Sequence, residues 1–265
     1  GVIFVISGGF VSSHDRLSDL PAHPLFNIRE LLKRGYTVFA VVHGSQPKFT
    51  IPEILEDMHR ATRFIRYHAK DYKIDPERIG ITGLSAGGHL SLMQGTAGTV
   101  KNLNTLDSID RISSRVQAVA CFFPPTDFLN YGKEGEVALG TGVLRAFKAP
   151  FDFHEMDTIT GAFVPVVLEQ RRREIGKKIS PAYHVTKESP PTLIIHGDKD
   201  LLVPIQQAEI MIAKFKEAGV PCELVVRKGE QHGWKNLLQD MKLVADWFDK
   251  YLLKKETTGA TSAAK

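Results

Sequence analysis

One pentapeptide, residues 83–87, constrains the fold of this chain more than any other feature. Its sequence, Gly-Leu-Ser-Ala-Gly, follows an apolar segment that we expect to be a strand and precedes a segment with helical spacing. In a sharp strand-to-helix turn of this kind the serine side chain is pushed out above the sheet edge, and the flanking glycines have no Cβ to clash. Ser85 is therefore a candidate nucleophile. The same five residues could also form an ordinary tight turn, so the assignment depends on partners elsewhere in the chain.

Length and composition are those of one large α/β domain. The chain has 265 residues, of which 43% are hydrophobic, so it can bury a sizeable core. Its 34 basic and 30 acidic side chains give a net charge of +4 that is spread along the sequence, which argues against a nucleic-acid partner. The densest basic run, residues 171–173, has helical spacing and is interpreted as a solvated helix face. No apolar run is long enough to span a bilayer.

The cysteine content indicates neither a disulfide framework nor a metal site. Only Cys121 and Cys222 occur, and both lie in strand-like runs, so we expect two buried thiols. We also expect no cofactor. A signal peptide, if the protein has one, would lie upstream of Gly1, so the compartment and the oligomeric state stay open.

Six apolar runs alternate with helical patterns along the chain. Strands are expected at residues 2–6, 36–42, 78–82, 116–123, 192–195 and 223–227. Helices are expected at residues 25–34, from Thr50 to about residue 68, after the pentapeptide to residue 97, and at 205–218 and 238–253. The second helix opens with a capping box formed by Thr50 and Glu53. This alternation predicts an α/β fold with a mostly parallel sheet and helices on both faces.

Residues 129–179 interrupt this rhythm. The segment carries several glycines and two helix-like pieces, at about 134–147 and 162–173, with no clear strand between them. We interpret it as a helical, cap-like insertion over the active-site end of a single domain that spans residues 1–254. The small, polar tail at residues 255–265 is expected to be disordered.

Polar residues gather where the expected parallel strands end, which is where such sheets bind ligands. Ser85 follows the third strand, Asp200 lies in the loop after the fifth, and His232 lies in the loop after the last. His232 can act as a general base toward Ser85, while Asp200 holds the imidazole tautomer and stabilises its charged form. The three residues are thus a candidate catalytic triad.

Attack on a carbonyl also needs hydrogen-bond donors for the developing oxyanion, each contributing roughly 3–4 kcal/mol. The backbone N–H of Ala86, next to the nucleophile, is one candidate donor. The turn Gly8-Gly9-Phe10, which follows the first strand, supplies the others. These four residues are the expected oxyanion hole.

Other residues compete for these roles. His43 and the following Gly-Ser resemble an oxyanion loop, but they follow the strand immediately before the Ser85 strand, so we expect them to have no direct role. Asp198 competes with Asp200, which is favoured because it immediately precedes the Leu-Leu-Val-Pro segment that leads into a helix. His196 and Trp234 are expected to pack rather than to contact substrate.

Three motifs carry a family resemblance. They are Gly-Leu-Ser-Ala-Gly-Gly-His-Leu, His-Gly-Asp-Lys-Asp-Leu-Leu-Val-Pro and Gln-His-Gly-Trp, and they bring Ser85, Asp200 and His232 in the chain order of the α/β-hydrolases. Together they resemble the acetyl esterase/lipase branch of that superfamily, which is similar to the prolyl-oligopeptidase-like and feruloyl-esterase-like families. The resemblance implies the α/β-hydrolase fold and hydrolysis of carboxylic esters by this triad.

The chain departs from that family at two places. Members usually carry His-Gly-Gly-Gly or His-Gly-Gly-Ala where this chain has Ser7-Gly8-Gly9-Phe10, so a phenyl ring is expected near the acyl pocket. Members also begin with strands that would lie before Gly1.

The expected function is that of a serine carboxylesterase. We expect it to act on small acyl esters, acetyl to butyryl, with small-molecule or carbohydrate esters as substrates, including acetyl or feruloyl groups on carbohydrate. One alternative is a serine peptidase of the prolyl-oligopeptidase type. A second is a non-catalytic binding protein built on the hydrolase fold.

Overall fold

A six-stranded parallel sheet forms the centre of the protein. The computed structural model describes residues 1–17 and 28–254. The strands are β1 (Val2–Val5), β2 (Val38–Val41), β3 (Gly80–Leu84), β4 (Ala118–Phe122), β7 (Thr192–Gly197) and β8 (Cys222–Arg227). They lie in the order β2-β1-β3-β4-β7-β8, and every neighbouring pair is parallel. The predicted α/β-hydrolase sheet is confirmed, and the predicted strand ends agree with these bounds within two residues.

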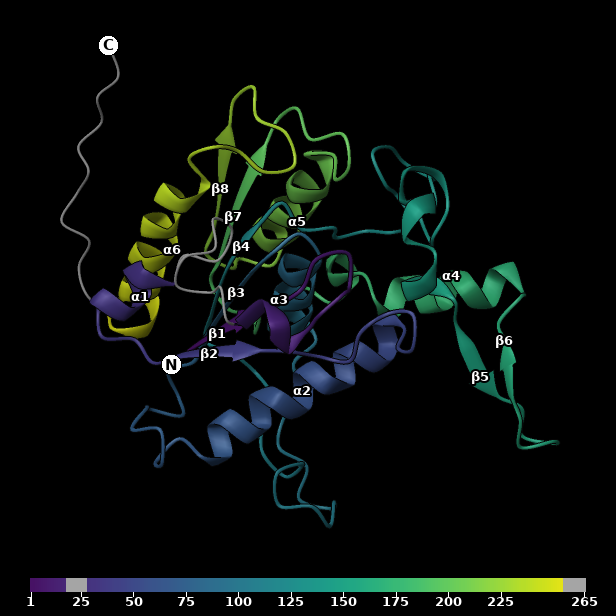
Figure 1. Cartoon of the computed structure of the whole chain (residues 1–265), viewed down its shortest axis with the longest axis horizontal. Coiled ribbons are helices and arrows are strands. Elements are labelled where there is room, and N and C mark those ends of the chain that lie inside the picture. Colours follow the sequence, from purple (N-terminus) through teal and green to yellow (C-terminus); the bar gives the residue numbers. More distant parts are fainter. Residues whose placement is uncertain (18–27, 255–265) are drawn as a thin grey trace.

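Helices cover both faces of this sheet, as predicted. Figure 1 shows α1 (Arg29–Lys33) and α6 (Leu237–Leu252) on one side and α2 (Ile51–Tyr67), α3 (Ala86–Thr96) and α5 (Gln206–Glu217) on the other. The buried side chains form two clusters accordingly, because successive residues of a strand point to opposite faces. In β1, for example, Ile3 and Val5 pack under α2, whereas Val2 and Phe4 pack under α6.

The ends of α2 follow from its sequence. The predicted capping box is present: the backbone N–H of Thr50 donates to Glu53 at 2.6 Å, and a proline follows in the first turn. Of the predicted α1, residues 25–27 lie outside the described part of the chain. The tail predicted at 255–265 lies outside it as well.

The insertion differs from its prediction. It contains the 3₁₀ helices η2 (Gly142–Phe147) and η3 (Ala149–Phe151), the strands β5 (His154–Met156) and β6 (Phe163–Pro165), and α4 (Glu169–Lys178). The helix predicted at 134–147 is wrong, because Gly135, Gly140 and Gly142 have positive φ and interrupt any helix there. The helix predicted at 162–173 begins only at Glu169, because residues 163–165 pair with β5 and form β6.

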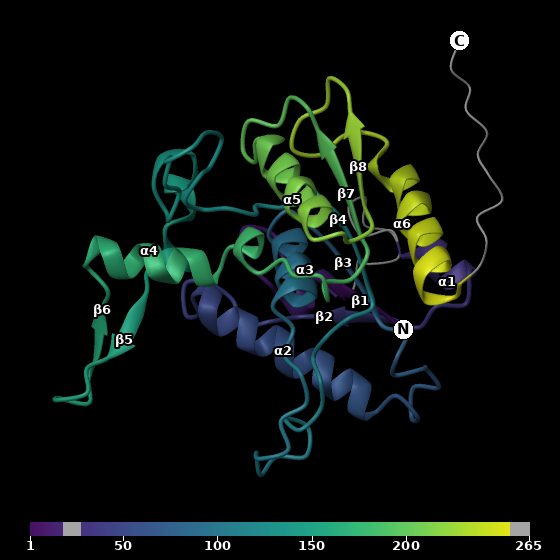
Figure 2. The same ribbon diagram turned by 180° about the vertical axis from the view of Figure 1, so that it is seen from behind.

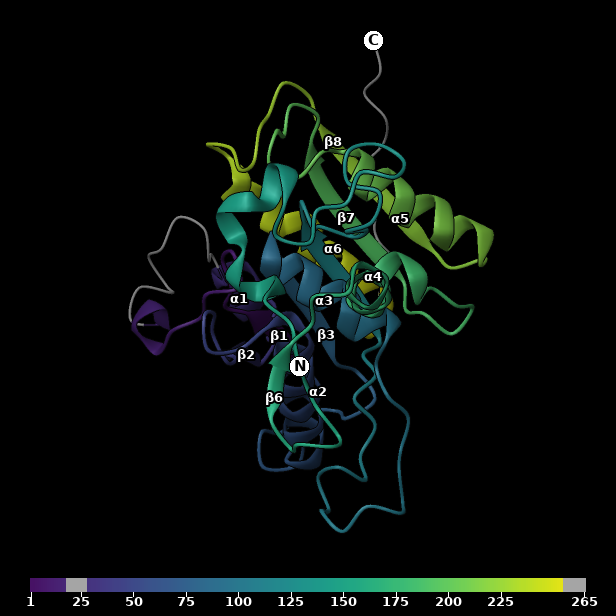
Figure 3. The same cartoon turned by 90° about the vertical axis from the view of Figure 1, so that its right-hand side faces the viewer.

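The hairpin β5–β6 stands away from the sheet. In Figure 1 it lies at the far right with α4, and Figure 2, seen from behind, places both at the opposite edge of the picture. Seen from the side in Figure 3, the hairpin faces the viewer in front of α2. The hairpin therefore projects, whereas other parts of the insertion, among them Leu139 and Ile175, are buried in the core.

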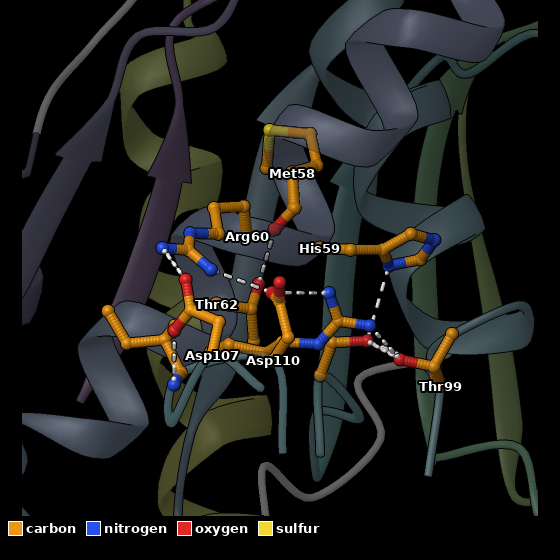
Figure 4. Close-up of polar contacts among 10 residues, drawn as sticks. Met58, His59, Arg60, Thr62, Thr99, Asp107 and Asp110 are labelled. Atoms are coloured by element: carbon orange, nitrogen blue, oxygen red, sulfur yellow. Dashed lines mark hydrogen bonds and ion pairs between the residues drawn. The ribbon is translucent and has the colours of Figure 1, made fainter. Parts of the chain in front are cut away.

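The long loop between α3 and β4 is fastened to α2 at the end of the sheet opposite to the elbow turn. Arg60 pairs with Asp107 at 2.7 Å and with Asp110 at 2.8 Å, as Figure 4 shows. On the buried side, Oγ of Ser114 lies 3.2 Å from Nδ1 of His59. These contacts hold the loop without involving any residue of the candidate triad.

Two smaller predictions need correction. Cys121 is buried as expected, but Cys222 on the edge strand β8 is half-buried. The basic run is not simply a solvated face: Arg172 turns inward and donates to backbone carbonyls of the insertion, those of Leu139, Phe151 and Val166. Among the helices of residues 1–17 and 28–254, none has the length and apolar character needed to cross a membrane.

Candidate active site

The pentapeptide forms a sharp turn between β3 and α3. Ser85 has φ 52° and ψ −117°, a backbone conformation that residues other than glycine rarely adopt. A Cβ on Gly83 would lie 2.5 Å from the carbonyl carbon of Gly87, and a Cβ on Gly87 would lie 2.9 Å from the carbonyl oxygen of Val5. Both glycines are therefore required by close backbone approach, and the turn presents Ser85 at the carboxyl edge of the sheet.

The structure brings the three candidate triad residues together from three separate loops. Nε2 of His232 lies 2.9 Å from Oγ of Ser85, and Nδ1 of His232 lies 2.7 Å from Oδ2 of Asp200. Because a carboxylate can only accept, the ring proton is on Nδ1, and Nε2 accepts the hydrogen bond of the serine hydroxyl. This geometry is that of a nucleophile, a base and a group that orients the base.

Asp200 is fixed by more than the histidine. Its Oδ1 accepts the backbone N–H groups of Leu202 and Val203 at 2.9 and 2.8 Å. Burial alone would raise the pKa of this carboxyl, but the hydrogen bonds from His196, His232 and the N–H of Val203 outweigh burial and hold the pKa well below its usual range. Asp200 therefore stays ionised next to the histidine.

The competing residues occupy other places. Asp198 accepts the N–H of Gly229 at 2.7 Å and does not contact His232 within the part of the chain that the structure describes. His196 is fully buried behind Asp200 and donates from Nε2 to the carbonyl of Val203 at 2.8 Å. Trp234 packs against a phenylalanine and donates to Asp240, so its predicted packing role is confirmed.

The turn after β1 lies beside Ser85 and lines the same cavity. The N–H of Gly8 donates to the carbonyl of Val11 at 3.1 Å, so the structure does not support Gly8 as an oxyanion donor. Among the described residues, the N–H groups of Gly9, Phe10 and Ala86 have no hydrogen-bond partner. These three remain the candidate donors.

Gln46 supports this turn and was not anticipated from the sequence. Its Nε2 donates to the carbonyl of Gly9 at 2.8 Å, and its backbone N–H donates to the carbonyl of Phe10 at 3.2 Å. The carbonyl of Gly9 shares a peptide plane with the N–H of Phe10, so its hydrogen bond to Gln46 fixes the direction of that N–H. His43, three residues earlier, is buried and does not line the cavity, and burial lowers the pKa of its ring.

A cavity of about 600 Å³ opens onto Ser85 and His232. Among the described residues that line it, Asp15 and His232 are the titratable ones, and most of the others are aromatic or aliphatic. Phe10 lines the cavity, as predicted from its place in the oxyanion turn. Its ring packs edge-on against that of Phe151, with 6.4 Å between the ring centroids. Such a cavity suits an uncharged, apolar acyl group.

The insertion forms part of this cavity. Leu144, Phe147 and Phe151 from η2 and η3 all line it. A Cβ on Gly9 would lie only 2.7 Å from Cε1 of Phe147, so the ring of Phe147 leaves no room for a side chain at position 9. Phe147 could not be predicted as a cavity residue, because nothing in its local sequence pattern distinguishes it from a helix-face residue.

A model of the BD-FAE family matches residues 1–215 of the chain. The chain belongs to the BD-FAE family. The matched part of this BD-FAE chain includes Ser85, Asp200 and the oxyanion turn, whereas His232 lies beyond it.

Individual relatives and solved structures similar to this chain are named as ester hydrolases. The probable carboxylic ester hydrolase LipM of Mycobacterium tuberculosis is 28% identical over 218 residues, which cover 82% of this chain and 45% of the relative. The chain spans about half the length of the curated relatives it matches. An acetyl ester-xyloside bifunctional hydrolase from Caldicellulosiruptor lactoaceticus superposes with a TM-score of 0.69 at 25% identity, covering 94% of this chain and 79% of that one. A truncated carbohydrate esterase from gut microbiota has a TM-score of 0.71 at 27% identity, covering 94% and 85%.

Proposed function

We propose that the protein is a serine carboxylesterase with Ser85 as nucleophile, His232 as general base and acid, and Asp200 as the residue that orients His232. The observation that carries the proposal is the unbroken hydrogen-bond chain from Asp200 through His232 to Ser85, with lengths of 2.7 and 2.9 Å. The names of the similar proteins, a probable carboxylic ester hydrolase, an acetyl ester-xyloside bifunctional hydrolase and a carbohydrate esterase, support the same activity.

In this proposal His232 takes the proton of Ser85 as its Oγ attacks the ester carbonyl. The tetrahedral oxyanion accepts hydrogen bonds from the N–H groups of Gly9, Phe10 and Ala86. The proton on His232 then passes to the leaving alcohol, and the acyl group stays bonded to Ser85. Water, activated by the same histidine, releases the acid and restores the enzyme.

For the substrate, we propose a small, uncharged acyl group, acetyl to butyryl, on an alcohol that includes carbohydrate. The apolar lining supports the acyl part, and the carbohydrate-linked names of two structural neighbours support the alcohol part. The peptidase alternative has no comparable support.

Labelling with a fluorophosphonate probe tests the nucleophile. The wild type should be labelled and Ser85→Ala should not, while Ser91→Ala, in the following helix, should be labelled normally. Turnover of p-nitrophenyl esters should fall by about 10⁴-fold or more in Ser85→Ala, because triad members act as a unit. Acetylated and feruloylated sugars and peptide anilides, assayed beside these esters, separate an esterase from a peptidase. A Ser85→Ala protein that is still labelled and active would rule out the assignment.

A further inference from the structure

The hairpin β5–β6 and the residues that join it to α4, residues 154–168, are called the arm here. Six large apolar side chains of the arm are exposed to solvent: Met156, Ile159, Phe163, Val164, Val167 and Leu168. The exposed fraction is 93% for Ile159 and 70% for Phe163. A concentration of exposed apolar side chains on a projecting element marks an interaction surface.

The arm is held rigidly although it projects. Arg171 at the start of α4 forms ion pairs with Glu155 on β5 and with Glu174 on α4. At the tip, Oδ1 of Asp157 accepts the N–H groups of the two residues that make the turn, at 2.9 and 2.8 Å. A two-stranded hairpin by itself is barely stable in water. The arm is therefore fastened to α4 in a position where its apolar side chains have no cover from the rest of the described chain.

The two faces of the hairpin differ. Met156 pairs with Phe163, and Glu155 pairs with Val164. Because neighbouring residues of a strand point to opposite faces, Glu155 and Val164 share the face turned to α4, to which the Glu155–Arg171 pair fixes it. Met156 and Phe163 share the other face, which is turned away from the molecule.

The outer edge of β6 is not suited to adding another strand. The N–H of Val166 donates to the carbonyl of Phe153, and that of Asp157 donates to the carbonyl of Ala162. In an antiparallel ladder these pairs alternate with pairs whose N–H groups point outward, and Pro165 occupies an outward position. Because proline has no N–H, the edge lacks a donor there. A partner at the β6 edge is therefore expected to contact the exposed side chains of the hairpin rather than to extend the sheet.

Charge and area distinguish between possible partners. Residues 152–170 contain four acidic side chains and neither lysine nor arginine. The arginines that follow are engaged within the chain: Arg171 and Arg173 pair with glutamates, and Arg172 donates to backbone carbonyls. The arm and these arginines therefore offer little attraction to the anionic surface of a membrane. Without Val164, which lies on the face turned to α4, the other five exposed side chains still present on the order of 800 Å², about what each partner contributes to a protein interface of standard size. An interface of that size can be completed by one copy of the same surface.

We propose that the arm is the contact through which a second copy of this chain binds, arm against arm about a twofold axis. In such a contact each copy offers the same surface, so Met156 and Phe163 of one copy pack on those of the other. The contact lies outside the cavity that holds Ser85, and it leaves the proposed esterase site open.

Sedimentation velocity over a range of micromolar concentrations tests this contact. The wild type should sediment at twice the mass of the monomer, and the double variant Ile159→Asp/Phe163→Asp should sediment as a monomer. Leu106→Asp is the matched control, because Leu106 is 97% exposed but lies in the loop between α3 and β4. This control should remain a dimer, and the dimer should persist at high salt because the contact is apolar. Circular dichroism checks that all three proteins are folded.

Hydrogen exchange provides a test that needs no variant. Backbone amides of the arm should exchange more slowly as the wild-type concentration rises, while amides of the loop that contains Leu106 should not change. A wild type that is monomeric at every concentration would overturn the proposal, as would a dimer that survives in the double variant. Protection of the arm only in the presence of phosphatidylcholine–phosphatidylglycerol vesicles would overturn it in favour of a lipid surface.

Discussion

Replacing Asp200 by asparagine changes the position of one proton in the proposed triad. In the aspartate, Oδ1 accepts two backbone N–H groups and Oδ2 accepts Nδ1–H of His232. An asparagine has a single oxygen, and the two backbone donors at Leu202 and Val203 compete for it more strongly than one imidazole does. The side-chain NH₂ then faces His232, whose Nδ1 must accept. The ring proton moves to Nε2, the atom that has to take the proton from Ser85.

The wrong tautomer should lower kcat by about 10³- to 10⁴-fold, which corresponds to about 4 to 5.5 kcal/mol of lost transition-state stabilisation. KM should change little, because Asp200 does not line the cavity. Asp198→Asn is the matched control. It alters a carboxylate two residues away whose hydrogen bond goes to Gly229, so its effect on kcat should be far smaller.

The assay is turnover of p-nitrophenyl acetate, with the concentration of folded enzyme set by fluorophosphonate titration of the wild type and by circular dichroism of the variants. An Asp200→Asn protein that kept more than about a tenth of the wild-type kcat would contradict the tautomer argument. A larger loss in Asp198→Asn than in Asp200→Asn would show that the acid of the triad has been assigned to the wrong aspartate.

Three further outcomes are expected. With p-nitrophenyl esters, kcat/KM should peak between acetyl and butyryl and fall by octanoyl, because overfilling the acyl pocket costs about 1–3 kcal/mol against about 0.8 kcal/mol gained per buried CH₂. Phe10→Ala should shift the peak to longer acyl chains, and a wild-type preference for decanoyl esters would refute this. Gly83→Ala should reduce kcat by about 10²-fold or more, because its Cβ would force the elbow open; an unchanged kcat would show that the turn tolerates the methyl group. Burial lowers the pKa of His89 from 6.5 to about 4, so between these pH values the unfolded chain binds a proton that the folded chain does not. As the pH falls from 6.5 to 4, the free energy of unfolding of the wild type should therefore decrease by about 3 kcal/mol more than that of His89→Phe. Urea unfolding at both pH values measures this, and an equal decrease in the two proteins would contradict it.

The sheet and the elbow could be predicted because their determinants are local. The apolar runs are short and rich in β-branched residues, which favours strands, and glycine at position 83 is required by a contact with Gly87, only four residues away. Asp200 and His232 were predicted because parallel strands end at one edge, so residues far apart in the sequence meet there. The hydrogen-bond distances from His232 to Asp200 and to Ser85, however, could be obtained only from the structure.

The insertion could not be predicted in the same way. Its run Ala-Phe-Val-Pro-Val-Val-Leu, residues 162–168, has apolar side chains at both helical and strand spacing, and the pairing with β5 decides between the two. The support that Gln46 gives to the oxyanion turn depends on a contact with a carbonyl 37 residues away. Neither feature has a local signature.

The contact between Phe147 and Gly9 means that two distant parts of the gene are not free to vary independently. A larger residue at position 9 would collide with the ring at 147, and a smaller residue at 147 would leave the turn unsupported on that side. Anyone who transplants the insertion of another BD-FAE protein into this chain should therefore transfer residues 8–11 with it. A chimera that exchanges only one of the two should fold around a misaligned oxyanion turn and turn over slowly, and restoring the matching partner should recover the rate.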